Sequence, residues 1–108
     1  MRRFSAELPD GGKIAYGLDA TLGGFWAEVR RPGRKRVAEY DALHPAEFQF
    51  ERPLQGLLYF LVQEGAFTEP QLHDALLYLE APTTTHRLPS GVKLAIEVVS
   101  NLKWAAAE

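Results

Sequence analysis

Apolar and polar residues alternate along the first forty positions of the chain, and this period of two is typical of half-buried β-strands. The turn sequences Pro9-Asp10-Gly11-Gly12 and Pro32-Gly33, with a connection over residues 19–24, divide the region into four short strands. We expect a type II turn at Pro32-Gly33, because proline presets its second position and glycine accepts the positive φ of its third. The apolar positions of these strands are Phe4, Ala6, Leu8, Ile14, Tyr16, Leu18, Phe25, Ala27, Val29, Val37, Ala38 and Tyr40. They predict a four-stranded antiparallel β-meander with one apolar face.

The second half of the chain has the apolar period of helices. In the first predicted helix, Pro53 suits the opening turn and Gly65 suits the end, because glycine adopts the left-handed conformation easily. The core stripe of this helix comprises Leu54, Leu57, Leu58 and Leu61, which fall at i, i+3, i+4 and i+7. Residues 41–53 read as a linker in which the alternating Phe48-Gln49-Phe50 is a candidate edge strand.

The second predicted helix has the clearest start signal in the chain. Thr68 is an N-cap residue, and Gln71 three positions later completes a capping box. Phe67 before the cap and Leu72 inside the helix form a hydrophobic staple, and Pro82 ends the helix. The expected core stripe comprises Leu72, Ala75, Leu76 and Leu79. Replacing Thr68 with Ala should lower the stability by about 1 kcal/mol.

The last segment, from Ser90 onward, has two interpretations. Most of its apolar residues fit an amphipathic helix, whereas Val92, Leu94, Ile96 and Val98 also alternate like a strand, so residues 92–99 stay open. The length of the segment and its terminal run of alanines favour the helix. The chain is therefore predicted to be one α+β domain, with a β-meander over residues 1–42 packed against about three helices over residues 53–106.

Composition places the chain among small globular proteins. Its 108 residues are 46% hydrophobic and 24% charged, which is ordinary for a single domain. Without cysteine, disulfides, thiolate catalysis and cysteine-bound zinc are excluded. The longest apolar run, residues 57–62, is far shorter than the roughly 20 residues that cross a bilayer, and no apolar segment of a secretory signal follows the first arginines. We therefore expect a cytoplasmic protein, and the scarcity of Met and Asn favours heat tolerance.

Charge is concentrated at one predicted turn. Five of the twelve basic residues lie within residues 30–36, namely Arg30, Arg31, Arg34, Lys35 and Arg36. The other seven basic residues and the fourteen acidic ones sum to −7, and the five bring the chain to −2. Because guanidinium groups bind phosphates and carboxylates well, this turn is a candidate site for a polyanion or an acidic protein. The alternative is a solvated turn whose charges protect the sheet from aggregation.

Several large apolar side chains fall off the predicted core stripes of the helices. At 100° per residue they face away from the core of a small domain. They are Tyr59, Phe60, Leu77, Tyr78, Ile96 and Trp104. Tyr59, Phe60, Leu77, Tyr78 and Trp104 predict a protein interface, such as that of a homodimer. The alternative is that helices packed between sheet and neighbours are covered on most sides.

The first two predicted helices, joined through Gly65, resemble the helix pair of a winged helix-turn-helix domain in their spacing over residues 54–80. The resemblance implies a second helix that reads DNA. That helix carries Glu69, Asp74 and Glu80 and no lysine or arginine, so it would repel phosphates. A helical hairpin packed on the sheet is the preferred interpretation.

The histidines are the remaining candidates for chemistry. Glu69 with His73 and Asp41 with His44 each supply only two ligands, whereas a catalytic zinc needs three. His86 follows three threonines but has no orienting carboxylate nearby in the sequence. We therefore predict no metal, no cofactor and no catalytic residue.

Together these features predict a small non-enzymatic interaction or regulatory module that associates with itself or with another protein. The basic turn would steer an acidic partner by its charge. The alternative is a nucleic-acid accessory protein that uses the same turn on phosphates, and an enzyme with an unrecognised site ranks third. No membrane partner is expected.

Overall fold

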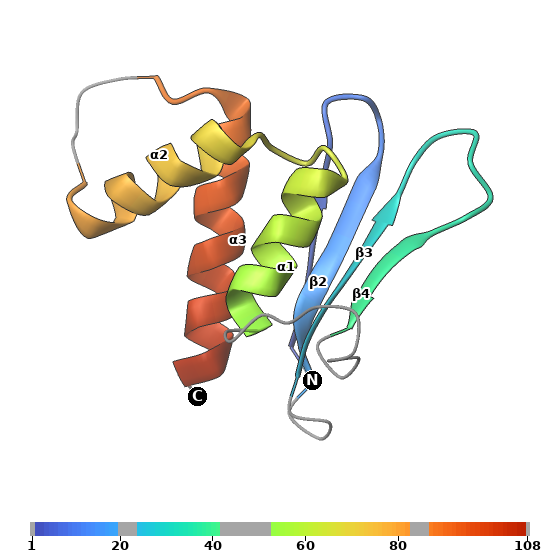
Figure 1. Ribbon diagram of the computed structural model, residues 1–108, viewed down its shortest axis with the longest axis horizontal. Coiled ribbons are helices and arrows are strands. Elements are labelled where there is room, and N and C mark those ends of the chain that lie inside the picture. The colour runs from blue at the N-terminus through green and yellow to red at the C-terminus, as the bar shows by residue number, and fades with distance from the viewer. Residues whose placement is uncertain (1, 20–23, 42–52, 83–86, 108) are drawn as a thin grey trace.

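The computed structural model of the chain describes residues 2–19, 24–41, 53–82 and 87–107. Within these residues a four-stranded antiparallel sheet is followed by three helices, so the predicted α+β fold is confirmed (Figure 1). The strands lie in chain order and are β1 (Arg2–Glu7), β2 (Lys13–Asp19), β3 (Gly24–Arg30) and β4 (Ala38–Asp41). The helices are α1 (Pro53–Gln63), α2 (Glu69–Glu80) and α3 (Ser90–Ala107). The candidate edge strand at residues 48–50 lies outside the described residues.

One face of the sheet is apolar, and α1 and α3 both pack on it. Ile14 pairs with Val29 and Tyr16 pairs with Ala27, and all four side chains are buried on the face toward the helices. Helix α1 packs on β3 and β4, whereas α3 packs on β1 and β2 (Figure 1). The core of the protein is therefore the layer between the sheet and these two helices.

The opposite face of the sheet carries polar side chains and one tryptophan. Trp26 lies next to Gly17 in the register, and the guanidinium carbon of Arg3 is 5.4 Å from the centre of a Trp26 ring. A Cβ atom on residue 17 would collide with the backbone oxygen of Arg2 and lie 3.1 Å from the Trp26 indole nitrogen. Glycine at position 17 is therefore what allows β1 and the indole to approach β2 so closely.

Both predicted hairpin turns are present. In the first turn, the carboxylate of Asp10 accepts a hydrogen bond from the backbone N–H of Gly12 at 2.8 Å. In the second turn, Gly33 has a φ of +75°, and the N–H of Arg34 donates to the carbonyl of Arg31 at 3.3 Å. A positive φ at the third position, after proline at the second, is the type II arrangement expected here.

Helix α1 ends where the sequence predicts, in a Schellman motif at Gly65. The φ of Gly65 is +80°, and its N–H donates to the carbonyl of Val62 at 3.0 Å. The N–H of Ala66 donates to the carbonyl of Leu61 at 2.9 Å. These two bonds satisfy carbonyls that the end of a helix would otherwise leave free.

Helix α2 begins with the predicted capping box. The hydroxyl of Thr68 accepts from the N–H of Gln71 at 3.2 Å, and the side-chain oxygen of Gln71 accepts from the N–H of Thr68 at 2.9 Å. Helix α2 then packs chiefly on α3, and Ala75 is its single buried residue in the described structure. Leu76 is 37% exposed, so its predicted place in the core stripe is wrong.

Residues 90–107 form one continuous helix, which decides between helix and strand for residues 92–99. From this helix, Asn101 Nδ2 donates to the hydroxyl of Tyr16 at 3.0 Å. Burial raises the pKa of the Tyr16 phenol, the hydrogen bond from Asn101 lowers it, and the nearby charge of Glu97 raises it further. The bond ties α3 to the middle of the sheet. No helix in the described ranges is long and apolar enough to cross a membrane.

Candidate functional site

The predicted basic site lies at the turn between β3 and β4, at one end of the sheet (Figure 1). We call residues 30–36 the basic connection. The side chains of Arg30, Arg34, Lys35 and Arg36 are exposed, whereas Arg31 is half-buried. The segment after the turn is not paired with β3 until Ala38. The sequence therefore places four solvated cations on one short loop.

Arg31 is directed into the protein and away from solvent. Its guanidinium group donates to the carboxylate of Asp10 in the first hairpin turn and to the backbone carbonyl of Glu64 at the end of α1. These partners are 21 and 33 residues away in sequence, and only 23% of the Arg31 side chain is exposed. Arg31 therefore links the two hairpin turns to α1 and is not free to bind a partner.

The surroundings of the Asp10 carboxyl favour its charged form. The hydrogen bond from the backbone N–H of Gly12 lowers the pKa of the Asp10 carboxyl most, desolvation raises it, and the charge and hydrogen bond of Arg31 lower it further. On the other side, a cation at the carbonyl of Glu64 complements the negative end of the α1 dipole. The Arg31 side chain thus helps to cap the C-terminal end of α1.

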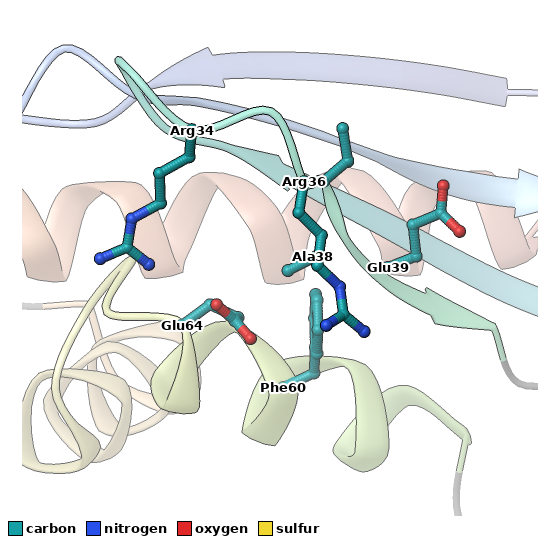
Figure 2. Close-up of a pocket in the computed structure, with 7 residues that line it drawn as sticks. Arg34, Arg36, Ala38, Glu39, Phe60 and Glu64 are labelled. Atoms are coloured by element: carbon teal, nitrogen blue, oxygen red, sulfur yellow. The ribbon is translucent and has the colours of Figure 1, made fainter.

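A groove of about 620 Å³ lies between the basic connection and α1. Arg34 and Arg36 extend from the connection toward the helix, and Phe60 rises from α1 below Arg36 (Figure 2). Val37 and Ala38 add apolar atoms to the lining. The groove therefore combines two guanidinium groups with an apolar floor.

Two acidic residues also line the groove. Figure 2 shows Glu64 on the helix side, between the ends of Arg34 and Arg36, and Glu39 on the strand side. Neither Arg34 nor Arg36 forms an ion pair with a described residue. The charge in the groove is thus patterned, with two unpaired cations alternating with carboxylates, and is not uniformly positive.

Three basic residues outside the basic connection, Arg2, Arg3 and Lys13, lie on the same sheet. Lys13 lies opposite Arg30 in the register of β2 and β3, on the face of the sheet that no described helix covers. Arg2 and Arg3 instead pair with residues 18 and 17, at the far end of β2 from the turn. Lys13 therefore lies beside Arg30 of the basic connection, whereas Arg2 and Arg3 lie far from the connection.

The five apolar residues predicted to form an interface do not all reach the surface. Phe60 is 6% exposed and its ring packs on that of Tyr40 at 5.7 Å between centroids, so its predicted position off the core stripe is wrong. Tyr59 is 45% exposed and Leu77 is 51% exposed, whereas Tyr78 is half-buried. The sequence also missed Leu76, which lies beside Leu77 on α2.

Trp104 is half exposed, but it has partners on the sheet. Its ring packs edge-on against Phe4 at 6.4 Å, and the guanidinium carbon of Arg2 lies 4.5 Å from the ring centre. Trp104 lies in the last turns of α3, whereas α2 crosses α3 near its first turns (Figure 1). The exposed apolar residues therefore do not form one continuous helical face.

The histidine candidates gain no support from the geometry. His73 is exposed on α2, and His44 and His86 lie outside the described residues. In the part of the chain that the structure describes, no three residues of the types that bind metal come together. Comparisons of the chain with protein-family models, with curated proteins and with solved structures find no match.

Proposed function

We propose that the protein is a small interaction module whose basic connection binds an acidic segment of a protein. The observation that carries this proposal is the groove between the basic connection and α1, where two arginines that form no ion pair with a described residue stand over an apolar floor. Guanidinium groups bind carboxylates in a bidentate manner, and the apolar floor accepts a side chain between them. Such a surface selects a segment that carries both acidic and apolar residues.

The pattern of charge favours a protein segment over a nucleic acid. Glu39 and Glu64 line the same groove, and a continuous phosphate backbone would be repelled by both. Arg31 is already used within the fold, so four basic residues of the connection are left, with Lys13 nearby. Binding by so few charges would be weak for a nucleic acid at physiological salt. A protein that places its carboxylates only beside the arginines avoids the repulsion.

The test uses poly-L-glutamate as an acidic polypeptide and a short mixed-sequence DNA duplex as the competing class of ligand. We expect the wild-type protein to bind poly-L-glutamate and to release it as salt rises, because exposed charges are screened. The variant Arg34→Glu/Arg36→Glu should lose this binding. A tighter, salt-dependent complex with the duplex than with the polypeptide would support the nucleic-acid alternative and contradict the proposal.

A matched control separates the site from the overall charge. Lys93 and Lys103 are exposed on α3, so Lys93→Glu/Lys103→Glu changes the net charge by the same amount at another surface. The control variant should bind poly-L-glutamate more tightly than the Arg34→Glu/Arg36→Glu variant. Equal weakening by both double substitutions would mean that net charge alone drives the binding.

A further inference from the structure

Helix α2 is the least covered helix of the described structure. Only Ala75 is buried among its twelve residues, and Leu76 and Leu77 are 37% and 51% exposed. Helix α2 projects to the side of α3, and its main contacts are with α3 and α1 and not with the sheet (Figure 1). A twelve-residue helix is marginal on its own in water, so it gains from any partner that covers its apolar residues.

The exposed surface of α2 is also acidic. Asp74 precedes Leu77 by three residues and Glu80 follows it by three, so the two carboxylates flank this leucine one turn away on either side. The helix contains no lysine or arginine, and neither acid forms an ion pair with a described residue. An exposed leucine between two unpaired carboxylates is the kind of segment that the groove at the basic connection would accept.

The two surfaces also match in spacing. Asp74 and Glu80 are six residues apart, which is about 9 Å along a helix. Arg34 and Arg36 are two residues apart, which is at most about 7 Å along the chain, and their long side chains cover the difference. Between them Phe60, Val37 and Ala38 offer apolar atoms to the leucine.

We propose that the acidic segment bound by the basic connection is α2 of a second copy of this chain. The proposal rests on the function proposed above and names its partner. The carboxylates of Asp74 and Glu80 pair with Arg34 and Arg36 of the neighbouring copy, and Leu77 packs over Phe60. The contact thereby covers charged and apolar side chains that are exposed in a single copy.

The geometry of the fold sets the type of assembly. The basic connection and the free end of α2 lie at opposite ends of the longest dimension of the protein, which is 40 Å (Figure 1). The contact therefore joins different surfaces of the two copies, head to tail. Such a contact leaves one surface of each kind free at the ends, so the assembly grows with concentration unless it closes into a ring.

The contact should be weak and sensitive to salt. The ion pairs are exposed, and the apolar area around one or two leucines is small for a protein interface. We expect the average mass in sedimentation equilibrium to rise above that of the monomer as the protein is concentrated from about 10 μM to about 1 mM. The rise should be smaller at high salt.

The decisive experiment mixes two charge-reversed variants. Arg34→Glu/Arg36→Glu destroys the basic surface and keeps α2, whereas Asp74→Lys/Glu80→Lys destroys the acidic surface and keeps the connection. Each variant alone should associate more weakly than wild type by at least roughly tenfold, because like charges now face each other. An equimolar mixture should regain the association of wild type, because the unchanged α2 of the first variant meets the unchanged connection of the second, and the two charge-reversed surfaces also complement each other.

The control variants Lys93→Glu/Lys103→Glu and Glu7→Lys/Glu97→Lys make equal charge changes at other exposed positions, and both should associate like wild type. Circular dichroism of each variant checks that the fold is intact. A folded wild-type protein that stays monomeric at every concentration, or a mixture that associates no more than either variant alone, would overturn the self-docking proposal. If poly-L-glutamate still bound through Arg34 and Arg36 in that case, the proposed function would stand and the partner would be another acidic protein. If the protein neither associates with itself nor binds poly-L-glutamate through Arg34 and Arg36, both proposals are wrong.

Discussion

Arg31 donates a hydrogen bond to the backbone carbonyl of Glu64, and so joins the turn after β3 to the end of α1 across 33 residues of sequence. The same guanidinium group pairs with the carboxylate of Asp10 in the other hairpin turn. One member of the basic run is therefore a structural residue, whereas Arg34 and Arg36 are exposed and form no ion pair with a described residue. Substitutions at Arg31 and at the two exposed arginines should therefore have different effects on stability.

Replacing Arg31 with Ala should lower the free energy of unfolding by about 1–3 kcal/mol, because the half-buried carbonyl of Glu64 loses a charged donor. Arg34→Ala and Arg36→Ala should change it by no more than about 0.5 kcal/mol, since both side chains are exposed and unpaired in the described structure. Urea denaturation followed by circular dichroism measures all three. Equal effects of the three substitutions would show that Arg31 has no special structural role.

The Asp10 carboxylate should make stability depend on pH in the acid range. The pKa of this carboxyl in the folded protein lies below its ordinary value of 3.8, chiefly because of the hydrogen bond from the N–H of Gly12 and also because of Arg31. A lowered pKa means that the stabilisation is present above the unfolded pKa and is lost as the pH falls through the folded one. Wild type should therefore be more stable than Asp10→Asn at pH 7, and the difference should shrink below pH 3.8. A difference that did not depend on pH would contradict this.

The buried phenol of Tyr16 should resist ionisation at alkaline pH. Burial raises the pKa of Tyr16 above its ordinary value of 10.0, so the stability that this shift contributes is fully present below that pH and is lost as the pH rises through the folded pKa. The urea midpoint of wild type should fall in this alkaline range, and that of Tyr16→Phe should fall less. Ultraviolet absorbance of the phenolates follows the titration directly, and Tyr16→Phe should remove the late step.

At neutral pH, Tyr16→Phe should cost about 1 kcal/mol, because Asn101 loses the acceptor of its 3.0 Å hydrogen bond. Since Asn101 is only half-buried, water can reach its amide and limit the loss. Asn101→Ala should remove the same bond with a similar cost. A double variant no less stable than either single variant is expected if the two residues act through this bond alone.

Gly17→Ala should destabilise the sheet by about 1–3 kcal/mol or more, because the added Cβ collides with the backbone of Arg2. The strand β1 must then move away from β2, and the indole of Trp26 must shift. Amide hydrogen exchange should therefore accelerate along β1, and tryptophan fluorescence should change. Gly33→Ala is the control, since nothing lies within 4 Å of its Cβ and its cost comes only from the positive φ. Unchanged exchange along β1 in Gly17→Ala would refute the close approach.

The local features of the fold could be predicted from the sequence because their causes are local. The type II turn needs proline and glycine side by side, and the capping box needs Thr68 and Gln71 three residues apart. The stop of α1 needs a glycine such as Gly65. Each of these depends on neighbours in the chain, so the residue pattern was sufficient.

The burial of individual helix positions could not be predicted, because it depends on which elements surround a helix. Helix α1 packs on the sheet and also touches α2, so its buried arc is wide enough to include Phe60. Helix α2 rests chiefly on α3, so its buried stripe is narrow and leaves Leu76 exposed. A core stripe predicted from helical spacing is narrower than the buried surface of α1 and wider than the buried surface of α2.

The run of basic residues could be predicted from the sequence. The different surroundings of Arg31 and of Arg34 and Arg36 could not. Nothing in the seven residues of the run distinguishes Arg31 from Arg34, because the partners of Arg31 come from distant turns. The apolar floor at Phe60 also comes from another element of the fold. The charged loop can therefore be found from the sequence. Which of its cations stay exposed depends on how the two hairpin turns pack against α1.

The central claim is that Arg34 and Arg36 bind carboxylates while Arg31 serves the fold. Its most direct test is a nuclear magnetic resonance titration with poly-L-glutamate that follows the arginine Nε–Hε signals, assigned through single Arg→Lys variants. The variant Asp74→Lys/Glu80→Lys is the sample, because its basic connection is intact and its own acidic surface is removed. We predict saturable, salt-sensitive shifts for Arg34 and Arg36 and a fixed signal for Arg31. Small, uniform shifts of all the arginines, or a shift of Arg31 as large as those of Arg34 and Arg36, would contradict the account.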